Sequence, residues 1–335
     1  MAHVEKVEKP LVSFVIFTYN QERYIREAVL SALAQTYSPL EIIISDDCSQ
    51  DNTAKIIQEE VKKYKGPHKV IININEKNIG LVAHINKVME FASGQYIVPN
   101  AGDDISEPQR TTSLVKIWNN GKVSAVWTNA VMIDESGKSG ELFYRNFGKV
   151  IKWKEMVHYG GSGVAGPGSS WDKSIFKSFG PLPSNTRNED MLIPFRAALL
   201  NGIAVLNEPL YRYRKHDNNL SYWVKMASCS GLEWINLREE QISNTIANYE
   251  NWIHALKQIA GKSQSVKEFE EAINIINMYI ALLRKENKML NENFLARFRT
   301  FLQKDWPKNS WKRRTKLSLL VISPLLYAKV IQKLQ

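Results

Sequence analysis

The first half of this 335-residue chain alternates short apolar runs with longer segments of helical period. The apolar runs are rich in β-branched residues, and in the segments between them apolar residues recur every three or four positions. Apolar runs bounded by turn residues are typical of strands buried on both faces, as in parallel sheets. We therefore expect a doubly wound α/β sheet, in which ligands bind beyond the carboxyl ends of the strands. The predicted strands are Ser13–Phe17, Glu41–Ser45, Val70–Ile74 and Tyr96–Val98, and the predicted helices are Glu22–Gln35, Asp51–Tyr64 and Leu81–Ala92.

The pattern changes in the second half of the chain. A strand within residues 122–133, a glycine-rich loop over 160–170 and a helix near 190–200 are followed by two long helical stretches, Leu232–Ile259 and Val266–Leu290. With 44% apolar residues the composition is that of a globular protein. We place one domain over residues 1–225 and a helical region over 226–335, whose helices offer one route to a homo-oligomer.

Basic charge is concentrated at the end of the chain. Residues 295–335 hold ten Lys and Arg residues against Asp305 alone, which is +9 of the net +10. Within them Leu317–Ala328 is apolar, but its 12 residues include Pro324 and fall short of the roughly 20 that span a bilayer. The tail predicts contact with an anionic membrane surface, and a helix packed on its own domain is the alternative. A nucleic-acid partner is not expected, because no recognition fold accompanies the charge.

The cysteines and the amino terminus bear on the compartment. Cys48 and Cys229 cannot build a disulfide framework, which favours a reducing setting. The first ten residues are polar and lack the apolar core of a signal peptide. With the basic tail, these features predict a cytoplasmic protein peripheral to the inner face of the cell membrane.

Polar residues follow each predicted strand, and two of these strand ends carry adjacent carboxylates, Asp46-Asp47 and Asp103-Asp104. Adjacent like charges raise at least one pKa, so each pair calls for a reason. The alternatives to a ligand site are helix capping for Asp46 and Asp51, and a solvated turn for the second pair. The chain has neither the G-x-G-x-x-G fingerprint nor the G-x-x-x-x-G-K-[ST] loop, which argues against a dinucleotide dehydrogenase and a P-loop nucleotidase.

Four segments together resemble the inverting glycosyltransferases of family 2, which have the GT-A fold. They cover about residues 11–221 in the family's order: VSFVIFTYNQERYIREAVLSALAQTYSPLEIIISDDCSQDNT, NIGLVAHINKVMEFASGQYIVPNAGDDI, NEDMLIPFRAALLNG and YRYRKHDNNLS. The resemblance implies a Rossmann-like, mostly parallel sheet flanked by helices, with the helical region as a C-terminal extension. It also implies a nucleotide-diphosphate sugar as donor, with UDP as the expected nucleotide.

The resemblance extends to individual residues on the donor side. Asp46 matches the carboxylate that holds the nucleobase or ribose, and Asp103 matches the last Asp of the metal-binding D-x-D element, followed by Asp104. The usual first Asp of that element is Ala101 here, which leaves the strength of metal binding open. A divalent cation, Mn²⁺ or Mg²⁺, would let both carboxylates stay ionised and would neutralise the departing diphosphate. The remaining donor-side residues implied are Thr18, Tyr19, Asn20, Asn78, Gly80, Arg214, His216 and Ser221, with His216 also a candidate metal ligand.

On the acceptor side, the resemblance makes Asp190 of Glu189-Asp190 the general base that takes the proton of the acceptor hydroxyl. The alternative is that this pair only complements the amino terminus of a helix. Gly161 and Trp171 belong to a glycine-rich stretch that would let backbone approach a sugar and offer a flat apolar face. A surface loop is the alternative there.

The leading hypothesis is a metal-dependent, inverting glycosyltransferase. It would transfer a sugar to a hydroxyl of a glycan or lipid-linked acceptor in surface polysaccharide biosynthesis. The rivals are a non-catalytic nucleotide- or sugar-binding module, favoured only by Ala101, and a basic scaffold protein that recruits partners through its tail.

Overall fold

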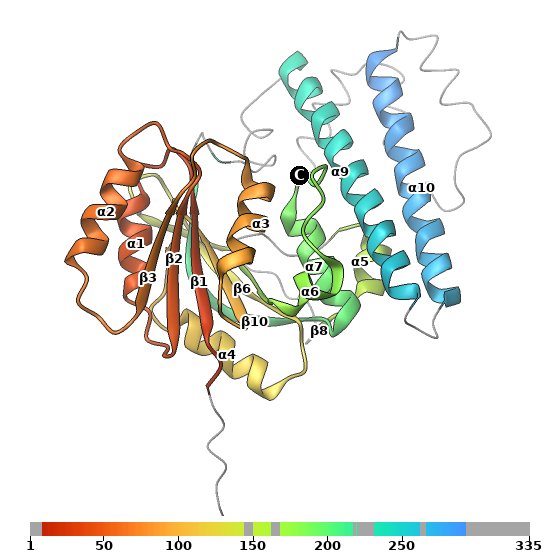
Figure 1. Cartoon of the computed structure of the whole chain (residues 1–335). Coiled ribbons are helices and arrows are strands. Elements are labelled where there is room, and N and C mark those ends of the chain that lie inside the picture. The colour runs from red at the N-terminus through yellow and green to blue at the C-terminus, as the bar shows by residue number, and fades with distance from the viewer. Residues whose placement is uncertain are drawn as a thin grey trace, which may run out of the picture. The chain divides into compact units, whose positions relative to one another are not determined.

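The computed structural model describes residues 9–143, 150–161, 168–216, 219, 231–261 and 266–292 (Figure 1). Its contacts divide the chain into two compact units. The first comprises residues 1–156, 161–184 and 189–214, and the second comprises 157–160, 185–188 and 215–335. The sequence places the domain transition at residue 225, which lies outside the described residues, as does the basic tail.

Four parallel strands and three helices form the amino-terminal half of the first unit, in the predicted order (Figure 1). The strands pair in the order β3-β2-β1-β4, and the register aligns Thr18 of β1 with Asp46 of β2. The doubly wound arrangement predicted from the sequence is therefore confirmed. The elements are β1 (Val12–Thr18), α1 (Ile25–Leu33), β2 (Leu40–Asp46), α2 (Thr53–Lys63), β3 (Lys69–Ile74), α3 (Leu81–Phe91) and β4 (Tyr96–Ala101).

The sheet continues beyond β4 into a mixed, ten-stranded sheet. β9 pairs antiparallel with both β4 and β6, and β10 runs parallel to β6, so β10 points the same way as β1. The sequence analysis predicted neither β10 nor the short strands β5, β7, β8 and β9. The elements that follow β4, up to residue 214, are β5 (Ile105–Ser106), α4 (Arg110–Asn120), β6 (Ala125–Ile133), β7 (Ser139–Phe143), β8 (Val150–Ile151), α5 (Trp153–Tyr159), β9 (Ser169–Asp172), α6 (Ser174–Phe179), α7 (Glu189–Leu200) and β10 (Ile203–Arg214).

The main core lies between one face of this sheet and the helices α1, α2 and α4. Alternate strand residues such as Phe14, Ile42 and Val98 point to this face and meet Val29 of α1 and Leu114 of α4. Figure 1 shows α1 and α2 on one side of β1–β3 and α3 on the other. Both faces of the parallel strands are covered, which explains why β1 and β2 are buried along their whole length.

Two long helices make up most of the described part of the second unit, α9 (Gly231–Ala260) and α10 (Val266–Asn291). Buried apolar residues from both helices, among them Trp252 and Ile276, form its core. Arg238 of α9 pairs with the buried Glu286 of α10 at 2.7 Å. The C-terminal helical extension is confirmed, and no helix among the described residues is long and apolar enough to cross a membrane.

Candidate functional site

The carboxyl ends of β1, β2 and β4 meet at one edge of the sheet, and the polar residues predicted for the donor side gather there. Backbone hydrogen bonds tie the loops that follow: Asp47 N donates to Thr18 O at 2.9 Å, and Gly102 N donates to Phe17 O at 3.0 Å. The structure therefore brings together Thr18, Asp46 and the turn that carries Asp103. This edge of the sheet is where a doubly wound fold binds its ligand.

The loops after β1 and β2 are joined by reciprocal hydrogen bonds. Asn20 N donates to Ser49 Oγ at 2.8 Å, and Asn20 Oδ1 accepts from Gln50 N at 2.8 Å. Asn20 and Cys48 both have positive φ, so each loop turns sharply. The Asn20 side chain thus holds the second loop in place, whereas Tyr19 beside it is exposed and can offer its ring to a ligand.

Asp46 is buried and hydrogen-bonded within its own loop. Its two oxygens accept from Ser49 Oγ at 2.5 Å and from Ser49 N at 2.9 Å. Burial raises the pKa of Asp46, and the two bonds from Ser49 act in the opposite direction. The Asp51 carboxylate accepts from the N of Thr53, the first residue of α2, at 2.9 Å, although the N-cap residue is Asn52, whose side chain makes no capping hydrogen bond.

Asp47 anchors the loop after β3, a role that the sequence analysis missed. Its carboxylate accepts from Asn75 Nδ2, Ile79 N and Gly80 N at 2.8, 3.0 and 2.9 Å. Gly80 has φ +78°, a conformation that glycine adopts without steric cost. Asn78 and Gly80 are exposed on this loop, so Asp47 fixes the backbone that carries both predicted donor-side residues.

Asp103 and Asp104 lie in a buried turn between β4 and β5. Asp104 is 1% exposed, and its Oδ1 accepts from Arg214 N at 2.9 Å. Burial, and after it the Asp103 carboxylate, raise the pKa of Asp104 well above its usual range, while Arg214 and Arg110 oppose the rise. Within the described ranges, Asp104 Oδ2 has no hydrogen-bond partner, so the turn holds a buried acidic oxygen to which no group donates.

A divalent cation fits this turn, with Asp103 and Asp104 as the residues that would hold it. The unpartnered Asp104 Oδ2 is a hard oxygen ligand of the type that Mg²⁺ and Mn²⁺ prefer. The described part of the chain contains no group of three His, Cys, Asp or Glu residues arranged to bind a metal. A cation held by one or two carboxylates therefore needs further oxygens from a ligand, as in sites where phosphates complete the shell.

Arg214 ends β10 and is fully buried. Its guanidinium donates to the main-chain oxygens of Asp103, Asp134 and Glu135 and to the carboxylate of Glu27. The resemblance implies a donor-side role for Arg214, whereas in the structure its guanidinium is hydrogen-bonded to acceptors of the protein. His216 belongs to the second unit, where its backbone N donates to Asn219 Oδ1 at 2.7 Å, and Ser221 lies outside the described residues.

Glu189 and Asp190 open α7, and both are partly exposed. The link Asn201–Gly202 reverses the chain between α7 and the parallel strand β10, so we infer that the first turn of α7 lies toward the carboxyl ends of the strands. Burial, with a further contribution from the Asp190 carboxylate, raises the pKa of Glu189 to about 8, and main-chain hydrogen bonds oppose this shift. A carboxyl group with a raised pKa is suited to donate a hydrogen bond or a proton near neutral pH.

The acceptor-side prediction for Trp171 is corrected by the structure. Trp171 lies in β9 in the interior of the sheet, is 3% exposed, and pairs with Ile97 near the start of β4. Its ring cannot offer a face to a sugar, because it is packed in the core at the end of β4 away from Asp103. Gly161 is partly exposed and ends a described segment; residues 162–167 of the same loop lie outside the described residues.

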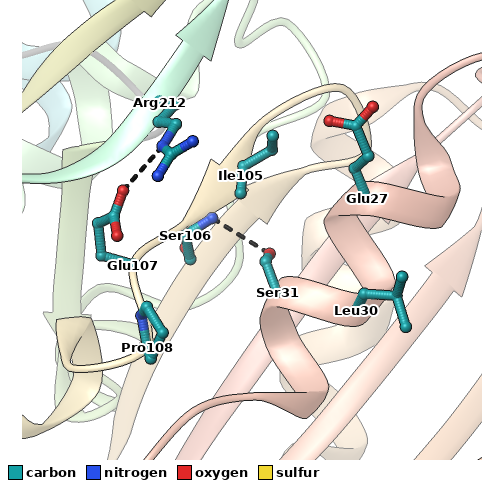
Figure 2. A pocket seen from close by; sticks show the side chains of 8 residues that line it. All are labelled: Glu27, Leu30, Ser31, Ile105, Ser106, Glu107, Pro108 and Arg212. Atoms are coloured by element: carbon teal, nitrogen blue, oxygen red, sulfur yellow. Dashed lines mark hydrogen bonds and ion pairs between the residues drawn. The ribbon is translucent and has the colours of Figure 1, made fainter. Parts of the chain in front are cut away.

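A surface pocket of about 320 Å³ lies between α1 and the β5 region and contains none of the predicted site residues (Figure 2). Its rim holds the ion pair of Arg212 and Glu107 at 2.9 Å, and Glu27 of α1. Glu27 is the partner of the buried Arg214, so the pocket borders the group that holds the Asp103 turn.

Comparison with known proteins identifies the domain that contains the carboxyl edge of the sheet with Thr18, Asp46 and Asp103. Residues 13–176 match the family model described as Glycosyl transferase family 2. Residues 13–176 form a glycosyl transferase family 2 domain. The putative glycosyltransferase EpsE of Bacillus subtilis is 34% identical over 132 residues, which cover 39% of this chain and 47% of EpsE. The uncharacterized protein Rv1520 of Mycobacterium tuberculosis is 29% identical over 215 residues, and the match spans only 60% of its length and 62% of this chain.

The fold agrees with this family 2 domain. The crystal structure of S. aureus TarS residues 1–349 in complex with UDP-GlcNAc has a TM-score of 0.61 to this chain, with 16% identity, and the match covers 96% of this chain and 90% of that one. The expected GT-A architecture, with helices after it, is therefore confirmed. The resemblance is in fold, and the assignment of individual site residues stays a prediction.

Proposed function

We propose that this protein is an inverting glycosyltransferase that uses a nucleotide-diphosphate sugar. The observation that carries the proposal is the convergence of Thr18, Asp46 and Asp103 at the carboxyl edge of a family 2 domain. The exposed Tyr19 and the anchored loop of Asn78 and Gly80 border the same edge and would contact the nucleotide. A UDP-sugar is the first donor to test, because TarS was crystallised with UDP-GlcNAc.

The residues divide the chemistry between a donor side and an acceptor side. A divalent cation at Asp103 and Asp104 would neutralise the charge that develops on the departing diphosphate. Asp190, at the start of α7, would accept the proton of the acceptor hydroxyl as that oxygen attacks the sugar carbon from the face opposite the diphosphate, which inverts the configuration. Glu189, with its pKa raised to about 8, is mostly protonated at pH 7 and would hydrogen-bond to the acceptor as a donor.

The acceptor and the location follow from the tail. The +9 charge of residues 295–335, with interleaved Trp and a short apolar run, supports a peripheral position on an anionic membrane. An enzyme held there would meet a lipid-linked glycan, which supports a role in surface polysaccharide biosynthesis. Self-association through the helical region, which contains α9 and α10, stays a prediction.

The test is a screen of nucleotide-sugars by thermal stabilisation and by donor hydrolysis, with Mn²⁺, Mg²⁺ or EDTA. We expect a UDP-sugar to raise the midpoint only when metal is present, and Asp190→Asn to keep this binding while transfer falls by about 10²–10⁴-fold, the range for a general base. Binding without turnover in the wild type would favour the non-catalytic module. Full transfer by Asp190→Asn would refute the assigned base, and activity in EDTA would refute the metal.

A further inference from the structure

The buried Arg214 joins four segments around the carboxylate turn. Its Nε donates to Asp103 O at 3.0 Å, and its Nη1 donates to Asp134 O and Glu135 O at 3.2 and 3.1 Å. Its Nη2 pairs with Glu27 Oε2 of α1 at 2.8 Å. The fork geometry of a guanidinium allows these bonds at once, which the ammonium of a lysine cannot reproduce.

The turn and Arg214 hold each other in both directions. While the side chain donates to Asp103 O, the backbone N of Arg214 donates to Asp104 Oδ1 at 2.9 Å. The end of β10 therefore fixes the main chain of one acidic residue and the side chain of the next. The angle at which the Asp103 side chain leaves the turn depends on these two bonds, because the turn spans only the residues between β4 and β5.

Glu27 supplies the negative charge opposite the guanidinium. Arg214 is fully buried, whereas the Glu27 side chain is 50% exposed at the rim of the surface pocket in Figure 2. A buried cation is costly unless it is paired and hydrogen-bonded, so Glu27 favours the observed orientation of Arg214. Its exposure means that Glu27 can be changed without opening a cavity in the core.

We propose that Arg214 is a positioning residue for the Asp103 turn and that Glu27 orients it, so that this pair sets the affinity of the site for a divalent cation. The proposed role requires no contact of either residue with the substrate. The inference rests on the proposed function for its metal, and it replaces the direct contact with the donor that the sequence resemblance implies for Arg214. Outer partners of metal ligands typically change metal affinity by about 10–100-fold when they are removed.

The experiment compares two glutamates that line the same pocket and each pair with an arginine. Glu27→Ala removes the partner of Arg214, and Glu107→Ala, the matched control, removes the partner of Arg212, which does not contact the turn. Arg214→Lys tests the fork itself, and Glu27→Gln restores an acceptor without charge. Mn²⁺ is titrated by electron paramagnetic resonance with saturating UDP, thermal midpoints are measured, and hydrogen exchange is followed over residues 101–104 without ligand.

We expect Mn²⁺ affinity to fall about tenfold or more in Glu27→Ala and Arg214→Lys, less in Glu27→Gln, and less than twofold in Glu107→Ala. The turn should exchange faster in the first two variants only, and the two glutamate-to-alanine variants should melt within a few degrees of each other. Equal effects of Glu27→Ala and Glu107→Ala on Mn²⁺ affinity, or unchanged exchange of the turn in Arg214→Lys, would overturn the inference. No Mn²⁺ binding by the wild type would refute the proposed metal site itself, and turn exchange would then still decide whether Arg214 holds the turn.

Discussion

Asp47→Asn is a sharp test of how the donor edge is held together, because it changes one atom of a fully bonded, buried carboxylate. Oδ1 of Asp47 accepts from Asn75 Nδ2 and Ile79 N, and Oδ2 accepts from Gly80 N at 2.9 Å. An asparagine that keeps its oxygen toward Asn75 and Ile79 must turn its amide NH₂ toward the Gly80 N–H. Two donors then face each other where a charge-assisted hydrogen bond stood.

The magnitude follows from that single lost bond. A hydrogen bond to a charged group contributes about 1.5–3 kcal/mol. Gly80 is exposed and its N also donates to Asn78 Oδ1 at 3.0 Å, so no penalty for an unpaired buried donor is added. We therefore expect Asp47→Asn to lower the free energy of unfolding by about 1–3 kcal/mol. For a unit of this size that corresponds to a fall of roughly 2–10 °C in the midpoint. Asp47→Ala also removes the acceptor of Asn75 Nδ2 and Ile79 N, while Gly80 N keeps Asn78 Oδ1, and it should cost about 3 kcal/mol or more.

The assay is urea unfolding followed by tryptophan fluorescence, together with a titration of UDP in the presence of Mn²⁺. Because Asn78 and Gly80 sit on the loop that Asp47 holds, UDP affinity should fall with stability. Glu59→Gln is the control. Glu59 is exposed, its ion pair with Arg26 is 3.7 Å long, and its loss should change the free energy of unfolding by less than about 0.5 kcal/mol. The reasoning is refuted if Asp47→Asn unfolds like the wild type, or if Asp47→Ala is no worse than Asp47→Asn.

Two further predictions concern the acceptor side and the tail. The pKa of Glu189 is raised from 4.5 to about 8, so the folded state binds the carboxyl proton of Glu189 more tightly than the unfolded state does. The free energy of unfolding of the wild type should therefore fall by at most about 1.4 kcal/mol per pH unit as the pH rises between these two pKa values. Glu189→Gln should therefore gain stability relative to the wild type between pH 5 and pH 8 in urea unfolding, and an equal difference at both pH values would contradict the shift. Deletion of residues 295–335 removes +9 of charge and should abolish sedimentation with anionic vesicles while activity on a soluble acceptor persists; retained sedimentation would assign membrane binding elsewhere.

The donor edge was predictable from the sequence because parallel strands place their following loops together. Each apolar run predicted one strand, and because these strands are parallel, the polar residues that follow β1, β2 and β4 lie at the same edge of the sheet. Trp171 was misplaced for the opposite reason. β9 is a four-residue strand, Ser169–Asp172, that follows a glycine-rich stretch and joins the sheet antiparallel. Nothing in so short a run distinguishes a strand in the sheet interior from a loop beside a ligand, because its pairing is set by distant residues of β4 and β6.

The roles within the paired carboxylates were not predictable, and their structure gives the physical reason. A strand that ends leaves the N–H groups of the following loop without ladder partners, and these groups must be satisfied if they are buried. Asp47 meets that need for the N–H group of the half-buried Ile79, and Asp104 accepts the N–H group of the buried Arg214, both of them far along the chain. Each pair thus has one member whose contacts secure neighbouring backbone. Two adjacent carboxylates at a strand end can therefore serve both to hold neighbouring backbone and to bind a ligand. Only their hydrogen-bond partners in the folded structure show which oxygen, such as Asp104 Oδ2, is left for a cation.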